Sequence, residues 1–273
     1  MSTLESNAIA LSVRIKAYPE QVWEAWMDLD RLSQWLVDKA SGWPGVGSSL
    51  ALTWERLQCT IDYQVAEAKP CEKLVWKARM PAGFQTLTIG LRREGPLTVV
   101  DLREVAPDNA PDVTESSSES SWQMSLAILK LYLENYFGQN REGFFSIKRA
   151  DFDNPTLLYY YSSAEGLSKW FAHAVEEFPR GESLTDLPYR LQLAENVTMS
   201  GQVLTRTRNE VTLSWNEISG YLELKCFDLG PGQQAVCLRG YGYGLTSEGA
   251  KAVEAMLSER LAILSGLLTA TES

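Results

Sequence analysis

One short block of sequence occurs twice in this chain, half a chain length apart. Leu32–Leu36 reads LSQWL and Leu167–Phe171 reads LSKWF, and an acidic residue precedes each block by two positions, Asp30 and Glu165. Repetition at a fixed period is the sequence signature of a duplicated structural unit. The 273 residues also fit two domains of about 135 residues better than one small domain. We therefore expect two domains of the same topology, residues 1–140 and 141–273.

The elements around each block also repeat in order: a strand, a helical segment, several strands and one long C-terminal helix. In the first copy Leu11–Lys16 alternates apolar and polar residues like a half-buried strand, and Pro19 suits the first turn of a helix. Residues 50–54, 61–65 and 74–78 alternate in the same way. This order predicts an α+β fold in which each long helix lies on a sheet.

The last two strands of each copy are expected to form a hairpin. In the first copy a turn at Glu94-Gly95-Pro96 predicts a set of opposed pairs with symmetric register. These pairs are Leu91 with Thr98, Ile89 with Val100 and Leu87 with Leu102. In the second copy a turn at residues 230–233 predicts Cys226 opposite Cys237 and Leu224 opposite Arg239. The two cysteines would then share a face within reach of disulfide geometry, although a reducing cytoplasm would keep them as thiols.

A polar segment separates the first hairpin from its helix. Residues 107–121 are acidic and serine-rich, and we expect a mobile loop that could act as a lid. Ser120 and Gln123 form a capping-box pattern, and an apolar stripe with helical spacing follows from Trp122 to Leu133, ending before Gly138. The second long helix is expected to begin near the cap Thr246.

The charge and the cysteine pattern exclude several classes of function. The formal net charge is −10, and the sequence contains no run of Lys and Arg, so neither nucleic acid nor a membrane is expected as a partner. The N-terminus lacks a basic region before an apolar stretch, which predicts a cytoplasmic protein. None of the four cysteines stands in a Cys-x-x-Cys pair, so no metal and no cofactor is expected.

The scarcity of histidine argues against catalysis. His173 is the single histidine of the chain, and we interpret it as a surface or packing residue. Because histidine is the usual general base near neutral pH, catalysis would have to use carboxylates, Tyr or Cys. Neither copy shows a paired acid and base at readable spacing. The protein is therefore expected not to be an enzyme, with that question left open.

Strand parity and helix phase direct several side chains of the first copy toward the space between sheet and helix. These candidate ligand-binding residues are Trp54, Tyr63, Trp76, Glu104, Trp122 and Leu126. Aromatic rings suit a plain core as well as a pocket for a flat apolar ligand, and both interpretations stand. A buried Glu104 would have a raised pKa and could act as an acid or base, whereas a fraying strand would leave it solvated. In the second copy Arg239 and Tyr241 are candidates for fixing an anionic or carbonyl group.

Residues 13–26, reading VRIKAYPEQVWEAW and followed by Leu32 and Trp35, carry a resemblance to a known family. This block, together with residues 69–76, resembles activators of the heat-shock chaperone ATPase (AHSA-type), a branch of the START-like or SRPBCC superfamily. The resemblance covers most of residues 9–137 and, more weakly, 144–268. It implies two tandem helix-grip domains, each a curved antiparallel sheet wrapped around a long C-terminal helix with an apolar cavity between them.

The fold alone does not select one function, because START-like domains include carriers, cyclases, receptors and chaperone activators. The first hypothesis is non-catalytic binding of a small hydrophobic ligand in the sheet-helix cavity. The alternative is binding of a protein partner, as a chaperone activator does. A cyclase- or lyase-type enzyme is the least favoured reading, because no acid-base pair is visible.

Overall fold

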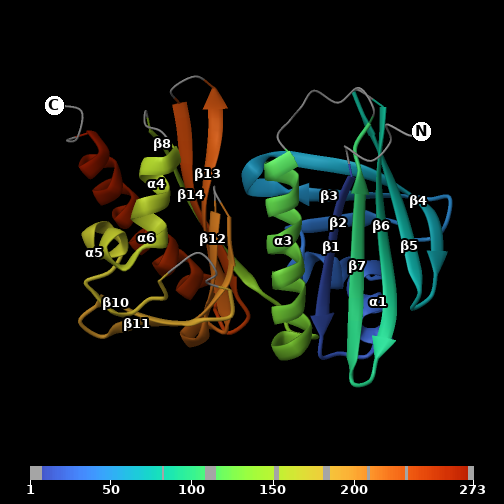
Figure 1. Ribbon diagram of the computed structural model, residues 1–273, viewed down its shortest axis with the longest axis horizontal. Coiled ribbons are helices and arrows are strands. Elements are labelled where there is room, and N and C mark those ends of the chain that lie inside the picture. Colours follow the sequence, from blue (N-terminus) through green and yellow to red (C-terminus); the bar gives the residue numbers. More distant parts are fainter. Residues whose placement is uncertain are drawn as a thin grey trace. The chain divides into compact units, whose positions relative to one another are not determined.

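The computed structural model describes residues 8–81, 83–107, 115–150, 154–180, 185–207, 210–230 and 233–269. The chain divides into two compact units, Met1–Gln139 and Asn140–Ser273, which we call the first and the second domain. Both have an α+β architecture with one seven-stranded antiparallel sheet each (Figure 1).

The first domain begins with a strand and two short helices, continues with six strands, and ends with its longest helix. Its strands are β1 (Ala8–Ile15), β2 (Lys39–Gly42), β3 (Ser49–Trp54), β4 (Cys59–Lys69), β5 (Lys73–Met80), β6 (Gly83–Glu94) and β7 (Leu97–Val105). Its helices are α1 (Pro19–Met27), α2 (Leu29–Trp35), the 3-10 turn η1 (Glu55–Leu57), α3 (Glu115–Leu131) and the π-helical turn η2 (Tyr132–Tyr136).

The second domain contains the same series. Its strands are β8 (Glu142–Ala150), β9 (Ala174–Glu177), β10 (Pro188–Ala194), β11 (Val197–Arg206), β12 (Glu210–Trp215), β13 (Gly220–Gly230) and β14 (Gln233–Gly242). Its helices are α4 (Asn154–Ser162), α5 (Ala164–Trp170), the 3-10 turn η3 (Asn216–Ile218) and α6 (Ser247–Thr269).

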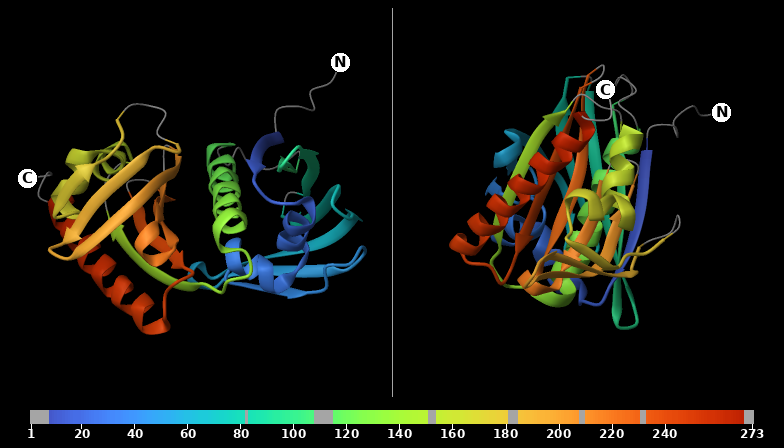
Figure 2. Two further views of the ribbon diagram at one scale, coloured as in Figure 1. Left: turned by 90° about the horizontal axis from the view of Figure 1, so that it is seen from below. Right: turned by 90° about the vertical axis from the view of Figure 1, so that its left-hand side faces the viewer.

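The two sheets have the same strand order. It runs β1-β7-β6-β5-β4-β3-β2 in the first domain and β8-β14-β13-β12-β11-β10-β9 in the second. The long C-terminal helix packs on its own sheet in each case, and Figure 2 shows α6 crossing the strands of the second domain. The expectation of one shared topology is confirmed, and the fold is a tandem of helix-grip domains.

Most helix boundaries agree with the sequence, but the start of α3 does not. The cap of α6 is confirmed, because the Thr246 hydroxyl accepts a hydrogen bond from the Gly249 N–H at 3.1 Å. The expected cap at Ser120 is wrong, since α3 already begins at Glu115 and Ser120 lies inside it. Serine and glutamate continue the helix upstream of its apolar stripe. Within the proposed lid, residues 107–121, the segment 108–114 lies outside the described residues, and residues 115–121 belong to α3, so the expected loop is wrong for that part.

In the first hairpin each residue of β6 pairs two positions further along β7 than the symmetric register predicts. Leu91 pairs with Val100, Ile89 with Leu102 and Leu87 with Glu104. Glu94 pairs with Leu97, so the turn consists of Gly95 and Pro96, and Gly95 adopts a φ of 60° that glycine tolerates well. The expected faces are nevertheless correct, because the shift moves each partner by two residues.

The register of the second hairpin corrects a larger error. Cys226 lies opposite Val236, and Cys237 lies opposite Lys225, so the expected Cys226–Cys237 pair is wrong. A register irregularity between Asp228 and Gly230 inserts one residue, and a slip of one residue sends a side chain to the other face. The two cysteines therefore lie on opposite faces of the sheet and cannot form a disulfide.

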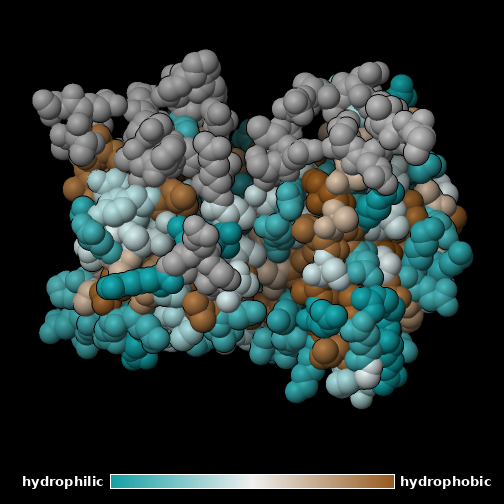
Figure 3. Space-filling model, viewed as in Figure 1, coloured by the Kyte–Doolittle hydropathy of each residue, from teal (hydrophilic) through white to brown (hydrophobic). Residues whose placement is uncertain are grey.

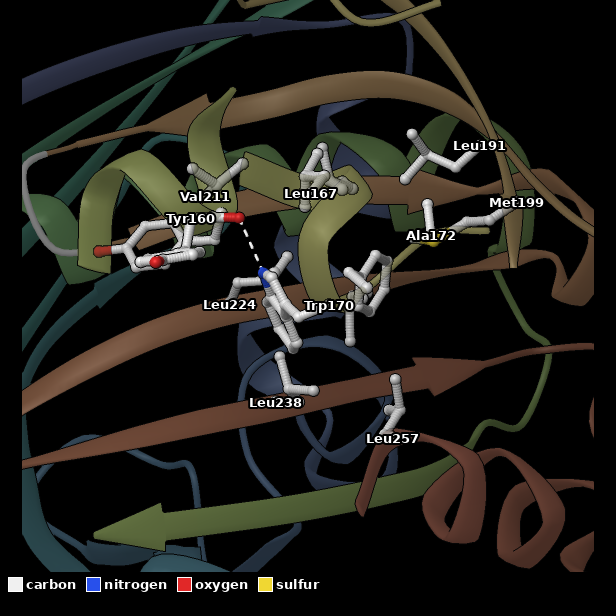
Figure 4. Packing of buried hydrophobic residues seen from close by; sticks show 14 of the residues in the cluster. Tyr160, Leu167, Trp170, Ala172, Leu191, Met199, Val211, Leu224, Leu238 and Leu257 are labelled. Carbon is white, nitrogen blue, oxygen red and sulfur yellow. Dashed lines mark hydrogen bonds between the residues drawn. The ribbon is translucent and has the colours of Figure 1, made fainter. Parts of the chain in front are cut away.

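Apolar residues of sheet and helices fill the interior of the second domain. Leu224, Leu238 and Leu257 lie in one cluster with Trp170, and all four are at most 2 % exposed. Figure 4 shows the Trp170 ring between strands and helices, with its indole N–H donating to the Tyr160 carbonyl at 2.8 Å. The first domain repeats this contact, since the Trp35 indole donates to the Ala25 carbonyl at 2.8 Å. This hydrogen bond fixes the second short helix of each domain against the first.

Some apolar side chains remain on the surface. Trp43 and Val46, between β2 and β3, and Phe84, at the start of β6, are each at least 60 % exposed. On the face that Figure 3 shows, apolar atoms reach the surface between polar ones in both domains. None of the helices in the described ranges is both long and apolar enough to cross a membrane.

Candidate functional site

A buried carboxylate marks the interior of the first domain. Glu104 lies near the end of β7 and is only 4 % exposed, which excludes the solvated alternative. One carboxylate oxygen accepts a hydrogen bond from the Ser118 hydroxyl at 2.7 Å, and the other accepts one from the Trp122 indole N–H at 2.6 Å. Ser118 and Trp122 are one helical turn apart on α3, so both donors reach the same strand position. The carboxylate thus connects α3 to the sheet.

A chain of neighbouring aromatic rings begins at Trp122, which is bonded to this carboxylate. The Trp122 ring lies 6.4 Å from that of Trp26 on α1, between centroids. The Trp26 and Trp76 rings meet edge to face at 5.6 Å, and the Tyr63 ring lies 5.6 Å from Trp76. We call these four aromatic residues and Glu104 the Glu104 cluster. The structure thus brings together four of the six candidate residues of the first domain, namely Tyr63, Trp76, Glu104 and Trp122.

Tyr63 keeps its proton in this environment. Burial, and in addition the negative charge of Glu104, raises the pKa of the Tyr63 hydroxyl above its usual range. The hydroxyl is therefore a neutral donor and acceptor near neutral pH. The cluster contains one carboxylate and several donor groups.

Two indole N–H groups of the cluster lack an acceptor among the residues that the structure describes. Trp26 is 1 % exposed and Trp76 is fully buried, and neither indole nitrogen has a hydrogen-bond partner among the described residues. Leaving a buried donor unsatisfied costs about 1–3 kcal/mol. Native proteins satisfy most such groups with protein atoms or ordered water. These N–H groups are therefore available to an acceptor that enters the cluster.

The two other candidates of the first domain have structural contacts. Leu126 is 3 % exposed and lies one turn after Trp122 on α3. Trp54 is half-buried, and its indole N–H donates to the Leu36 carbonyl at 3.1 Å, which attaches β3 to the end of α2. Sequence reasoning missed Trp26 as a cluster member, although it lies on the apolar stripe of α1.

The second domain has no carboxylate at the corresponding position. On its two neighbouring strands, Glu104 pairs with Ile9 and Leu87. In the second domain Phe144 and Leu222 hold the places of Ile9 and Leu87, and the residue that pairs with both is Gly240. A Cβ atom on Gly240 would lie 2.1 Å from the Tyr221 carbonyl oxygen and 2.5 Å from the Phe144 ring. The Phe144 ring therefore occupies the space beside this strand position, and only glycine fits.

The other members of the cluster are also replaced. Trp76 pairs with Val65 and Leu87, and Leu213 holds the matching place between Val203 and Leu222. Val203 thus corresponds to Val65. Tyr63 lies two residues before Val65, so its counterpart is Gly201, two residues before Val203 on β11. The place of Trp26 is taken by Tyr161, whose hydroxyl is buried without a partner among the described residues. The Trp215 ring instead meets Phe144 edge to face at 6.2 Å.

Arg239 and Tyr241 lie on the face of their sheet that points away from the apolar cluster of the second domain. The expected pairing of Leu224 with Arg239 is wrong, because Arg239 lies opposite Glu223. Its guanidinium donates to one Glu223 oxygen from two nitrogens, at 2.9 and 2.7 Å. The Arg141 guanidinium covers the Tyr241 ring at 3.6 Å. Both residues are thus engaged outside the sheet-helix interior.

A second ion pair lies on the same face. The Lys225 ammonium is 2.9 Å from a carboxylate oxygen of Glu210, a fully buried residue. Burial raises the pKa of Glu210, while the charge of Lys225 opposes that rise. No group of three or more His, Cys, Asp and Glu residues in the described part of the chain is arranged to hold a metal ion.

The geometry of the Glu104 cluster is suited to recognition. The edge-to-face and tilted rings offer apolar contact, while the indole N–H groups offer directional donors. The described residues place no second carboxylate and no histidine in the cluster.

Comparison with known proteins connects this architecture to a family. Residues 16–134 match the model of "Activator of Hsp90 ATPase homolog 1-like protein". No curated protein matches the chain.

Several solved structures are similar. The Aha1 dimer from Colwellia psychrerythraea is 25% identical, with 46% of this chain and 96% of that chain covered and a TM-score of 0.42. Two others match nearly the whole chain. DynU16 of the dynemicin biosynthetic locus is 15% identical (96% and 99% covered, TM-score 0.44), and the di-domain ARO/CYC StfQ of the steffimycin pathway is 11% identical (97% and 99%, TM-score 0.44).

The match covers the three strands β4, β5 and β7 and the two helices α1 and α3, which together carry the Glu104 cluster. The second domain repeats the strand order without that cluster. The chain is therefore a tandem of two helix-grip domains, the first of which matches the family model of "Activator of Hsp90 ATPase homolog 1-like protein" over residues 16–134.

Proposed function

We propose that the first domain binds a small, flat and mainly apolar molecule between its sheet and α3, and that it does so without chemical conversion. The observation that carries the proposal is the pair of buried indole N–H groups on Trp26 and Trp76 without acceptors among the described residues. Native proteins satisfy most buried donors, so two unpartnered indole N–H groups on rings in edge-to-face contact are unusual. A ligand that inserts between the rings would supply both apolar contact and an acceptor.

The proposal assigns the second domain a supporting role. Glycine and leucine replace the cluster residues there, and Phe144 fills the space beside Gly240. The second interior keeps two buried donors without a partner among the described residues, the Trp215 indole N–H and the Tyr161 hydroxyl, but it lacks the carboxylate and the contacting tryptophan pair of the first. Arg239 and Tyr241 are no part of the proposed site, because they lie on the other face of their sheet.

Native mass spectrometry of the freshly purified full chain tests the proposal. We expect a bound small molecule in the wild-type spectrum, its loss in Trp122→Ala, and its retention in Leu257→Ala. The two variants are matched, because each shortens a side chain of the long helix in one domain. A wild-type spectrum without adduct after purification from several hosts would contradict the proposal. An adduct lost only from Leu257→Ala would move the site to the second domain.

The family match favours a second candidate function, the activation of an Hsp90-type ATPase through protein contact. The measurement is the ATPase rate of a purified Hsp90 with increasing amounts of the full chain. A rate that rises and saturates supports this function. A flat response at concentrations well above those of the chaperone would exclude it for that chaperone.

A further inference from the structure

We infer that the ligand of the first domain carries a neutral carbonyl oxygen, which accepts hydrogen bonds from the indole N–H groups of Trp26 and Trp76. This inference rests on the proposed function and specifies the class of ligand. It also makes these two tryptophans the residues that determine specificity.

The polar groups of the cluster differ in whether they already have a hydrogen-bond partner. Both oxygens of Glu104 already accept hydrogen bonds, from Ser118 and Trp122. An indole N–H can donate but cannot accept. Trp26 and Trp76 therefore need an acceptor from outside the described residues, and a donor on the ligand would not satisfy them.

The charge of the cluster selects among acceptors. The carboxylate of Glu104 is buried beside the rings, and in a low-dielectric interior it repels a second negative charge strongly. Among the described residues, no Lys or Arg forms a hydrogen bond, ion pair or ring contact with this cluster to offset that repulsion. A carboxylate or phosphate on the ligand is thus disfavoured. A ketone, quinone or similar neutral carbonyl provides the acceptor without the charge.

The shape of the surroundings points to a planar molecule. Trp26 contacts Trp35 and Trp76 edge to face, with centroids 4.8 and 5.6 Å away, and Trp122 lies near it at a smaller angle. Flat conjugated carbonyl compounds can contact such rings and still direct one oxygen toward their edges. In the second domain Leu213 replaces Trp76, and the buried donors without a partner among the described residues are the Trp215 indole N–H and the Tyr161 hydroxyl. These two groups are not a pair of tryptophan rings in edge-to-face contact, which is the arrangement that we assign to carbonyl recognition.

Fluorene and 9-fluorenone form a matched pair of probes, since they share one tricyclic skeleton and differ by one carbonyl group. We measure both by equilibrium dialysis against the full chain. The wild-type protein is expected to bind fluorenone about fivefold more tightly than fluorene, as one hydrogen bond to a neutral acceptor predicts. The preference is expected to disappear in the double variant Trp26→Phe with Trp76→Phe.

Two controls keep the result interpretable. Trp35→Phe removes an indole N–H that is already bonded to the Ala25 carbonyl, so this variant should retain the fluorenone preference. Trp170→Phe does the same in the second domain. Retained preference in both controls, together with its loss in the double variant, supports the inference.

The outcomes separate this inference from the function on which it rests. Equal affinity for both probes in the wild-type protein would overturn the carbonyl inference and leave the ligand-binding function standing, with water as the acceptor. Failure of both probes to bind would count against both. A fluorenone preference that survives the double variant would show that other residues recognise the oxygen.

Discussion

The two domains share a strand order and differ at the centre of their interiors. At one position of the seventh strand the first domain has Glu104, held by Ser118 and Trp122, and the second has Gly240 beside the Phe144 ring. The contact of Trp35 with Ala25 is repeated by Trp170 with Tyr160, so the frame around that position is preserved. The comparison teaches that the shared strand order and tryptophan contacts specify the fold. A few interior positions determine whether polar groups lie between the sheet and the long helix.

The cysteines provide the largest expected contrast between the domains. Cys59 in the first domain is exposed, whereas Cys226 and Cys237 in the second are buried. Burial raises the pKa of the Cys237 thiol from 9.0 to about 12, which lowers its thiolate fraction near pH 8 by about 1000-fold. We expect Cys59 to react with Ellman's reagent at once, and Cys237 only after denaturation. Rapid reaction of a variant with both Cys59→Ser and Cys71→Ser, in which only the two buried thiols remain, would contradict the assigned burial.

Gly240→Ala tests the closed interior of the second domain. The new Cβ would meet the Tyr221 carbonyl and the Phe144 ring, and we expect a loss of about 3 kcal/mol in the free energy of unfolding. Gly266→Ala is the matched control, because a Cβ there meets no atom within 4 Å. Urea denaturation measures both. Equal stability of the two variants would mean that Phe144 does not occupy the space beside Gly240.

Glu104→Ala tests the polar centre of the first domain. The variant leaves the Ser118 hydroxyl and the Trp122 indole N–H without their acceptor, and we expect a loss of about 1–3 kcal/mol. Glu104→Gln retains one acceptor oxygen and should lose less. If both variants unfold at the same urea concentration, the hydrogen bonds to α3 contribute little.

Replacement of tryptophan by phenylalanine gives the smallest and sharpest contrast. Trp35→Phe and Trp170→Phe each remove an indole hydrogen bond to a carbonyl, whereas Trp26→Phe removes a donor without a partner among the described residues. In ligand-free protein we expect the first two variants to be less stable than Trp26→Phe by about 1 kcal/mol, as one hydrogen bond predicts. Thermal unfolding measures the difference. A Trp26→Phe variant as unstable as Trp35→Phe would reveal an acceptor for Trp26.

Much of the fold follows from local patterns in the sequence. Strands such as β1 and β5 alternate with period two, and the repeated tryptophan block sets the correspondence between the domains. The edge strands β2 and β9 were not predicted, because each has only four residues and no clear alternation. Their positions depend on pairing with β3 and β10, which is a tertiary effect.

The candidate site was predictable only in part. Parity correctly directed Tyr63, Trp76 and Glu104 inward, since a period of two fixes the face once the strand is known. The same reasoning failed for Arg239, because an irregularity before the second turn shifts the register by one residue and reverses the faces. Periodicity cannot locate such a bulge. The hydrogen bonds of Glu104 also required α3 to begin earlier than its apolar stripe.

The most direct test of the account follows the indole signals of the full chain, labelled with ¹⁵N, during addition of 9-fluorenone. The nine tryptophans can be assigned from single Trp→Phe variants. We expect the signals of Trp26, Trp76 and Trp122 to shift and those of Trp170 and Trp215 to stay in place. Shifts of equal size at Trp170 and Trp215, or none at Trp26 and Trp76 under saturating probe, would contradict a binding interior confined to the first domain.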